Sequence, residues 1–309
     1  MIERELIEYI RELTARDEPA WLKVGLGDDA AVIEPPGGGG GCLVITTDTV
    51  VEGVHFEPGT EPRLVGWKAM ARGVSDLAAM AARPLCTLAA AHFPPGLSDA
   101  AARDLVRALV EAARTLSAPL VGGDTAAGAD RLSVAVTAVG TPGPKGAITR
   151  AGARPGDAVC VTGELGGAMA GRHLTFRPRV EEALELAERC DVHALIDVSD
   201  GLSTDALHVA EAGGVGLALR AADIPVSAAA TEMAARDGRQ PLQHALADGE
   251  DYELLFCLPP VQAERLLETG LGELAVSLIG EVTDGPESCL LMPDGRREPL
   301  RAEGWEHRT

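Results

Sequence analysis

Aromatic and basic side chains are both scarce in this chain. Phenylalanine, tryptophan and tyrosine make up 3% of the 309 residues, and 27 lysines and arginines stand against 47 aspartates and glutamates, for a formal net charge of −20. This balance argues against a nucleic-acid-binding surface, which needs a stripe of basic residues. A protein this acidic also needs a bridging cation before it can bind phosphates. Magnesium is the usual bridge, because it binds carboxylates and phosphates at once.

The cysteines and histidines give no sign of a zinc site or of a disulfide framework. None of the six cysteines forms a CxxC pair, and the seven histidines contain no HExxH or comparable ligand spacing. We therefore interpret the cysteines as small apolar residues that are buried in the core. They are Cys42, Cys86, Cys160, Cys190, Cys257 and Cys289.

Long hydrophobic runs are also missing, since no stretch approaches the roughly 20 apolar residues that a membrane-spanning helix requires. The N-terminal segment MIERELIEYIREL has the pattern of an amphipathic, charged helix and not that of a signal peptide. Hydrophobic residues make up 46% and charged residues 24% of the chain, which is the usual balance of a globular protein. We expect a soluble, cytoplasmic protein without a membrane partner.

Strands and helices are predicted on both sides of a boundary at 141–146, which is rich in proline and glycine. The pattern predicts an α/β (α+β) protein of two lobes, residues 1–144 and 145–309. Two prolines and five glycines at 35–41 predict a flexible connection between the first two strands. Helices are expected at 63–82 with an interruption at Gly73, after the N-cap Ser98, at 180–189 and at 204–212. Strands are expected at 30–33, 42–45, 88–93, 118–121, 132–139, 158–162, 194–198, 215–219, 252–258 and 276–279.

Five short acidic segments are candidates for a functional site. Four of them, at 25–29, 46–48, 122–125 and 197–201, place aspartate beside glycine, serine or threonine at the end of an apolar strand, and the fifth, 74–77, lies inside a helix. Sites in α/β proteins assemble at strand ends, and small neighbours let the backbone approach a phosphate. Any one segment alone is more often a turn or a helix cap. Together, and without histidine or cysteine ligands, they favour magnesium over zinc or copper.

Two further features carry a weaker signal. The glycine-rich segment 163–168 follows a strand, but it lacks both the GK[ST] ending of a Walker A motif and the GxGxxG pattern, so a plain turn is the simpler interpretation. Arg150 follows the lobe boundary, and its guanidinium has the planar fork that binds a phosphate with two hydrogen bonds. Without further support, an ordinary surface arginine is the better interpretation of Arg150.

Eight motifs between residues 3 and 305 resemble, in order and spacing, those of the thiamine-monophosphate kinase family. They are GLGDDAAV, ITTDTVVEGVHF, VSDLAAMAARP, VGGDT, ITRAGARPGD, VTGELGGA, IDVSDGL and DGEDYEL. The resemblance implies transfer of the γ-phosphoryl group of ATP to thiamine monophosphate, giving thiamine diphosphate and ADP. It also implies a homodimer that pairs through an N-terminal mixed sheet with helices. The C-terminal α/β lobe would complete an active site between the lobes.

The resemblance further implies roles for individual residues. Asp48, Asp76 and Asp124 are expected at the centre of catalysis. The residues expected to contact ATP are Gly123, Asp124, Arg150 and Ser199. Those expected to contact thiamine monophosphate are His55, Glu250 and Trp305. The expected magnesium ligands are Asp29, Thr46, Thr47, Asp48, Asp76, Asp124, Asp197 and Asp200.

The chemistry of this transfer suits such residues. The acceptor is an ionised phosphate oxygen, so the reaction needs positioning and charge neutralisation rather than a strong base. The lack of a convincing catalytic histidine or lysine is therefore consistent with it. Glu250 would offset the positive charge of the thiazolium ring, and Trp305 would stack on that ring. The alternatives are that Trp305 only packs the C-terminal tail and that His55 is an ordinary structural histidine.

The chain departs from the family at Gly73 and Ala81, where asparagine and glycine are common, and at Asp248, where glycine is usual. Other functions also fit parts of the sequence. Aminoimidazole ribonucleotide synthetase, from the same superfamily, is the nearest rival. Selenophosphate synthetase would carry a reactive cysteine or selenocysteine and a lysine near 25–29, and the hydrogenase-maturation ATPase would end in a cysteine; this chain has neither. A non-catalytic nucleotide-binding regulator on the same fold is the alternative from another class.

Overall fold

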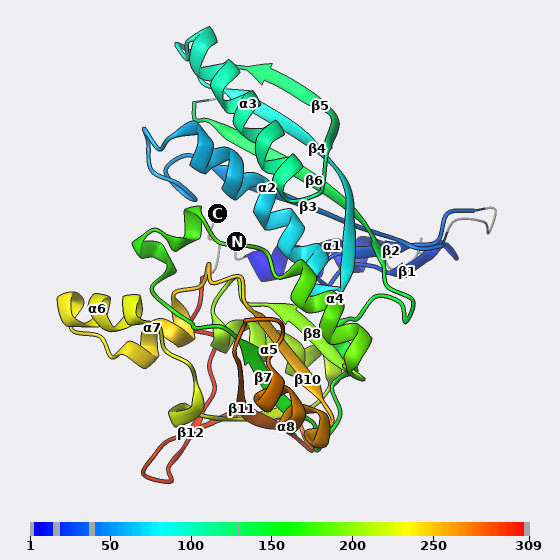
Figure 1. Cartoon of the computed structure of the whole chain (residues 1–309), viewed down its shortest axis with the longest axis vertical. Helices are drawn as coiled ribbons and strands as arrows, with labels where there is room; N and C mark the ends of the chain where they lie inside the picture. Colours follow the sequence, from blue (N-terminus) through cyan, green and yellow to red (C-terminus); the bar gives the residue numbers. More distant parts are fainter. Residues whose placement is uncertain (1–2, 15–18, 37–40, 129, 306–309) are drawn as a thin grey trace.

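Two mixed sheets, each with helices packed against it, make up the two lobes of the molecule (Figure 1). The computed structural model describes residues 3–14, 19–36, 41–128 and 130–305. The glycine run at 37–40 and the C-terminal residues 306–309 lie outside the described residues. None of the helices described is long and apolar enough to cross a membrane.

The sheet of the N-terminal lobe has the strand order β1-β2-β3-β6-β4-β5. Its neighbouring strands are antiparallel except for β4 and β5, which run parallel and are joined by the crossover helix α3. The strands are β1 (Leu22–Val24), β2 (Ala31–Ile33), β3 (Leu43–Val51), β4 (Ala82–Phe93), β5 (Leu120–Ala127) and β6 (Ser133–Pro142). The helices are α1 (Glu3–Thr14), α2 (Pro62–Ala79) and α3 (Asp99–Thr115).

Alternation along the strands gives this sheet two unlike faces. Val44 and Val50 of β3 and Val134 and Val136 of β6 are at most 1% exposed, and they pack in the cores beneath α2 and α3. Side chains at the intervening positions point to the opposite side of the sheet. On β3 and β6 these positions are half-buried or exposed, so the sheet has one face that is covered more fully than the other.

We call the other side the open face, meaning the side chains of β3, β6, β4 and β5 that point away from α2 and α3. Thr47 is exposed there and Leu88 is 39% exposed. On the edge strand β5, Val121 is 63% exposed and Asp124 pairs in register with Ala90 of β4. An exposed sheet edge with apolar residues is a surface that proteins usually cover.

Helix α2 connects the two lobes. It runs without a break through Gly73, so the expected interruption there is wrong. A Cβ atom at Gly73 would lie 3.2 Å from Cβ of Ala138 on β6, so glycine lets the helix pack tightly against the sheet. At its C-terminal end, Ala78 and the following Ala81 belong to a core that includes Leu186 and Phe256 of the C-terminal lobe.

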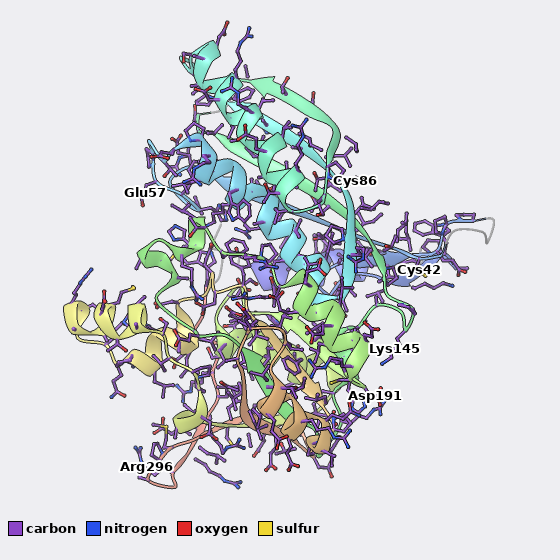
Figure 2. All side chains as sticks on the ribbon, viewed as in Figure 1. Cys42, Glu57, Cys86, Lys145, Asp191 and Arg296 are labelled. Atoms are coloured by element: carbon purple, nitrogen blue, oxygen red, sulfur yellow. The ribbon has the colours of Figure 1, made fainter. Side chains whose placement is uncertain are left out.

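The sheet of the C-terminal lobe has the order β13-β12-β9-β11-β7-β10-β8. One face packs against α4 and α8 and the other against α5 and α7, while Arg296 lies at the far tip of the β12–β13 hairpin (Figure 2). The strands are β7 (Ala158–Thr162), β8 (Ala194–Asp197), β9 (Gly216–Arg220), β10 (Leu254–Leu258), β11 (Val276–Thr283), β12 (Cys289–Leu291) and β13 (Arg297–Pro299). The α-helices are α4 (Val180–Arg189), α5 (Leu202–Gly213), α6 (Ala228–Asp237), α7 (Pro241–Ala247) and α8 (Pro260–Thr269). Short 3-10 helices are η1 (Arg150–Gly152), η2 (Ala168–Ala170), η3 (Arg172–Leu174) and η4 (Ala221–Asp223).

Most expected elements are present, with two kinds of correction. The segments around Asp48 and Asp124 lie within β3 and β5 and not at strand ends. The cysteines are all free as expected, but only three are buried; Cys42 and Cys86 (Figure 2) and Cys289 are half-buried. The elements that were not expected from the sequence are the helices α6, α7 and α8 and the strands β1, β12 and β13.

Candidate active site

Four aspartates from both lobes converge where α2 meets β8, and we call them the acidic cluster. Asp29 comes from the β1–β2 loop, Asp48 from β3, Asp76 from α2 and Asp197 from the end of β8. The Thr46 hydroxyl donates a hydrogen bond of 2.5 Å to Oδ2 of Asp76. The structure thus brings together residues that lie as far apart in sequence as 29 and 197.

Mutual repulsion and burial dominate the electrostatics of this cluster. Burial raises the pKa of Asp76 well above its usual value, and the charges of Asp48, Asp197 and Asp29 raise it further. Burial, followed by the charge of Asp29, also raises the pKa of Asp197 to about 7. Buried carboxylates of this kind are stable as anions only with a nearby cation.

A divalent cation fits the donors that are present. Among the described residues, the buried Oδ2 of Asp29 has no hydrogen-bond partner. The surrounding ligands are carboxylate and hydroxyl oxygens, which suit magnesium. The four residues Asp29, Asp48, Asp76 and Asp197 are therefore the candidate ligands of such an ion.

Arg150 provides a positive charge at one side of the cluster. Its Nη2 lies 2.6 Å from Oδ1 of Asp29, and its backbone N–H donates to Asp28 at 3.3 Å. Burial, and then the neighbouring charge of Asp29, raises the pKa of Asp28 to about 6 despite the guanidinium. The Arg150 side chain is only 15% exposed, so the interpretation as an ordinary surface arginine is wrong.

Two cations on α2 were not foreseen. Lys68 is fully buried, with its Nζ 2.5 Å from Oε2 of Glu250 and 2.7 Å from the carbonyl oxygen of His55, to which it donates. Arg72 donates to both oxygens of Asp48, from Nε at 3.3 Å and from Nη2 at 3.1 Å. The sequence held a signal for them, because Lys68, Arg72 and Asp76 are spaced by four and share one face of a helix.

The residues expected to bind thiamine monophosphate fall into two places. Lys68 joins the His55 backbone to Glu250. Nδ1 of His55 accepts a hydrogen bond of 3.0 Å from the backbone N–H of Val51, so its proton is on Nε2. Trp305 is 56% exposed, and its backbone N–H donates to the carbonyl oxygen of Asp200 at 3.0 Å.

Asp200 lies at the start of α5 beside a second group of ligand atoms. Carboxylate and imidazole atoms of Asp200, Asp205 and His208 lie within 4.8 Å of one another. The buried Asp205 carboxylate accepts hydrogen bonds from the backbone N–H groups of Asp200 and Gly201, each at 3.1 Å. The carbonyl oxygen of Ser199 accepts a hydrogen bond of 2.7 Å from the backbone N–H of Glu250, which holds the two loops together.

Gly123 and Asp124 are not brought to the acidic cluster within one chain. Asp48, Val136, Ala89 and Gly123 form one row across β3, β6, β4 and β5. Three strand spacings of about 4.8 Å separate the ends of this row by about 14 Å. Gly123 has φ +154°, and a Cβ atom there would lie 1.9 Å from the carbonyl oxygen of Ala89, so the fold itself requires this glycine.

Thr47 and Thr46 face opposite sides of β3. The Thr46 hydroxyl faces Asp76, whereas the Thr47 hydroxyl receives a hydrogen bond of 3.3 Å from Thr137 on the open face. Thr46 could therefore offer its hydroxyl to a metal held by Asp48, and Thr47 only a backbone oxygen.

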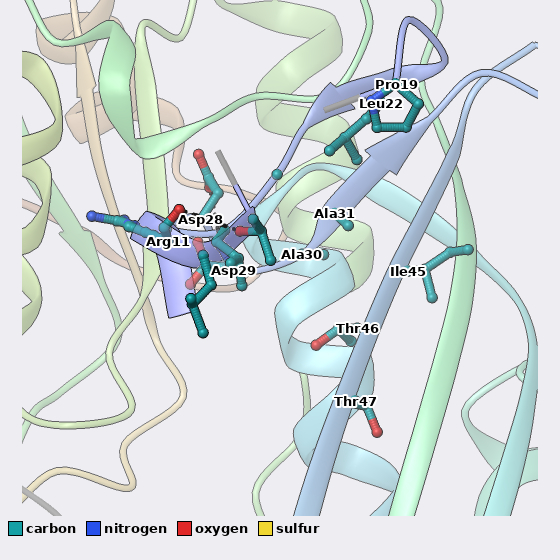
Figure 3. A pocket seen from close by; sticks show the side chains of 15 residues that line it. Arg11, Pro19, Leu22, Asp28, Asp29, Ala30, Ala31, Ile45, Thr46 and Thr47 are labelled. Carbon is teal, nitrogen blue, oxygen red and sulfur yellow. Dashed lines mark hydrogen bonds between the residues drawn. The ribbon is translucent and has the colours of Figure 1, made fainter. Parts of the chain in front are cut away.

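A cavity of about 680 Å³ lies next to the acidic cluster (Figure 3). The glycine-rich segment 25–29 and the strand residues 45–47 form much of its wall, and Arg11 of α1 lies beside Asp28 and Asp29 at one end. The opposite end is more apolar, with Pro19 and Leu22. Such a cavity suits a ligand with one anionic and one less polar end.

Two protein-family models match the chain, one on each side of residues 142–153. A family model described as AIR synthase related protein, N-terminal domain, matches residues 27–141, and one described as AIR synthase related protein, C-terminal domain, matches residues 154–291. The thiamine-monophosphate kinase of Rhodopirellula baltica is 39% identical over 313 residues, covering 99% of this chain and 97% of the relative. That of Escherichia coli K12 is 33% identical, with 93% of this chain and 92% of the relative covered.

Solved structures agree with these relatives. A structure described as AaThiL complexed with AMPPCP and TMP superposes with a TM-score of 0.84 at 28% identity, over 99% of this chain and 97% of the other. The thiamine-monophosphate kinase of Stenotrophomonas maltophilia K279a gives 0.73 at 33% identity, over 96% and 98%. The hydrogenase maturation protein HypE, at 22% identity and a TM-score of 0.72, shares the fold.

Proposed function

The chain belongs to the thiamine-monophosphate kinase family of AIR synthase related proteins, and we propose that it performs their reaction through magnesium bound by the acidic cluster. It is an ATP-dependent kinase whose acceptor already carries a phosphate. The observation that carries the magnesium proposal is the convergence of Asp29, Asp48, Asp76 and Asp197, three from one lobe and one from the other.

The reaction itself asks little of the protein in acid–base chemistry. An ionised oxygen of thiamine monophosphate forms a bond to the γ-phosphorus of ATP. The bond from that phosphorus to the β–γ bridging oxygen breaks, and its electron pair leaves with ADP. No proton has to be removed from the acceptor, so the side chains have to bind, orient and shield two polyanions.

The proposed metal-binding residues fit this task. Bound magnesium would supply neutralisation of phosphate charge. Asp76 lies central in the cluster, since Thr46 holds one of its oxygens and three other carboxylates surround it. Asp200 is a further proposed ligand at the start of α5, and Thr46 and Thr47 would contribute a hydroxyl and a backbone oxygen.

ATP is proposed to occupy the cavity beside the cluster, with its phosphates toward the segment 25–29. Support comes from the position of the cavity and from the hydrogen bond that Arg150 donates to Asp29. The glycines of this segment also let the backbone approach a ligand. Ser199 is proposed to contact ATP from the C-terminal lobe. Thiamine monophosphate is proposed to bind on the side of His55 and Glu250, with Trp305 closing over it.

A homodimer through the open face would resolve the position of Asp124. Leu88 and Val121 are exposed on that face, and the edge of β5 is unpaired among the described residues. Asp124 points to the same side as Ala90 and would face a second copy of the sheet in such a dimer. We therefore propose that Gly123 and Asp124 serve the active site of the partner subunit. The proposed division into residues 1–144 and 145–309 leaves one sheet in each lobe.

The assignment is tested by following ATP and thiamine species together. Purified protein with ATP and magnesium should consume ATP only when thiamine monophosphate is added, and thiamine diphosphate should appear in equal amount. Steady ATP loss without thiamine diphosphate would contradict the kinase assignment and favour another superfamily activity. A cytoplasmic location is proposed because the enzyme depends on ATP.

A further inference from the structure

Arg72 lies between the two halves of the active site. It is one helical turn after Lys68, which contacts Glu250 and the His55 carbonyl, and one turn before Asp76 of the acidic cluster. Four residues of helix correspond to about 6 Å along the axis. The phosphate of thiamine monophosphate has to lie in this interval. In the proposed arrangement the thiamine part of the substrate contacts His55, and the reactive phosphate oxygen lies near the metal ligands.

The contacts of Arg72 are loose, so its guanidinium is available to bind a further anion. Its hydrogen bonds to Asp48 measure 3.1 and 3.3 Å, longer than the 2.7–2.9 Å of a tight charge-assisted pair. Its Nη1 lies 3.8 Å from Oε1 of Glu250, beyond hydrogen-bond distance. The guanidinium is thus near two carboxylates and makes a close bond with neither.

Metal binding would change the partners of Arg72. Asp48 is a proposed magnesium ligand, and an oxygen that coordinates a metal is a weaker acceptor for the guanidinium. The Arg72 side chain is only 16% exposed, so water cannot fully replace the lost hydrogen bonds. A phosphate at this position would restore them, because its oxygens match the planar fork of arginine.

We propose that Arg72 is a specificity-determining residue that binds the phosphate of thiamine monophosphate, and that Asp48 and Glu250 hold its guanidinium in position before the substrate enters. This inference rests on the proposed function. A guanidinium at this position explains how a site with so many carboxylates can bind the phosphate of thiamine monophosphate. Its consequence is discrimination between the phosphorylated vitamin and free thiamine, which lacks the group that Arg72 binds.

The test compares two ligands in four proteins. Dissociation constants for thiamine monophosphate and for thiamine are measured by calorimetry, with magnesium and without nucleotide, for the wild type, Arg72→Gln, Arg72→Lys and Arg83→Gln. Arg83 is a matched control, because it is an arginine of the same lobe whose side chain is 62% exposed. Circular dichroism and thermal melting verify that each variant is folded, and Arg72→Lys, which keeps the charge, provides a milder change if Arg72→Gln is unfolded.

The expected result is a selective loss. Arg72→Gln should weaken binding of thiamine monophosphate by about tenfold or more, and Arg72→Lys by less, while binding of thiamine changes by less than about twofold. Arg83→Gln should bind both ligands as the wild type does. An equal loss for both ligands would show that Arg72 only supports the site, and an unchanged affinity for thiamine monophosphate would also overturn the proposal. Failure of the kinase assignment is distinct, because the wild type itself would then form no thiamine diphosphate.

Discussion

The Ser75 hydroxyl on α2 donates a hydrogen bond of 2.5 Å to Oδ2 of Asp197 at the end of β8. Both side chains are buried, and the bond crosses from one lobe to the other. It favours the ionised form of Asp197 in surroundings where burial and Asp29 oppose it. The two lobes therefore meet through a direct contact to a proposed metal ligand.

Ser75→Ala should destabilise the protein by about 1–3 kcal/mol, because it leaves a buried acceptor without its donor. The free energy of unfolding is measured by guanidinium denaturation. Thr115→Ala is the control, since that hydroxyl is on the exposed side of α3 and its loss should cost less than about 0.5 kcal/mol. An equal effect of both changes would show that the contact between the lobes contributes little.

Asp76→Asn should lower turnover by several orders of magnitude and leave the fold intact, because it removes a charge from the centre of the proposed metal site. Without metal, its melting temperature should rise, since one of the mutually repelling carboxylates becomes neutral. Steady-state kinetics and thermal melting with EDTA measure the two effects. Near-normal activity at saturating magnesium would contradict the model of the acidic cluster.

The metal-free protein should lose stability as the pH rises toward 7. The pKa of Asp197 is raised to about 7 in the folded state, so between about pH 4 and pH 7 the folded protein holds a proton that the unfolded chain has released. Stability therefore falls with increasing pH across this window. Bound magnesium compensates the negative charge, so the gap in melting temperature between magnesium and EDTA should widen from about pH 5 to about pH 8. A constant gap would count against metal binding at Asp197, and Asp197→Asn should narrow the gap.

Mixing two inactive variants tests whether Asp124 acts across the dimer. If it serves the partner subunit, a heterodimer of Asp76→Asn and Asp124→Asn contains one site with both aspartates intact. Random pairing should then restore about a quarter of wild-type activity. If Asp124 acts within its own subunit, no mixture regains activity. Val121→Glu in both variants should prevent the subunits from pairing, as measured by sedimentation, and should also prevent the recovery of activity.

The local parts of the fold were accessible from the sequence. Strand β7 and helix α4 have the predicted bounds, because an apolar run and a helical repeat define each of them without outside help. Gly73 was misleading, since a glycine lowers helix propensity but here allows close packing against Ala138. Tertiary packing decided that case, and no local pattern reports it.

The composition of the site was harder to predict. The aspartates were visible as motifs, but their grouping depends on strand order, which puts Asp48 and Gly123 at opposite ends of a row that crosses four strands. Lys68 and Arg72 were overlooked because a cation inside an acidic site has no motif of its own. Their shared helix face with Asp76 was the one usable signal.

Because α2 contributes side chains to the cores of both lobes, the two lobes share part of their interior. Chimeras in which one lobe is replaced by that of a relative should therefore pack poorly where the lobes meet. Exchanging α2 together with the residues at Leu186 and Phe256 should restore this packing. For the same reason, heating should melt the molecule in a single transition. The two lobes are therefore expected to unfold as one unit, although the chain divides between two sheets.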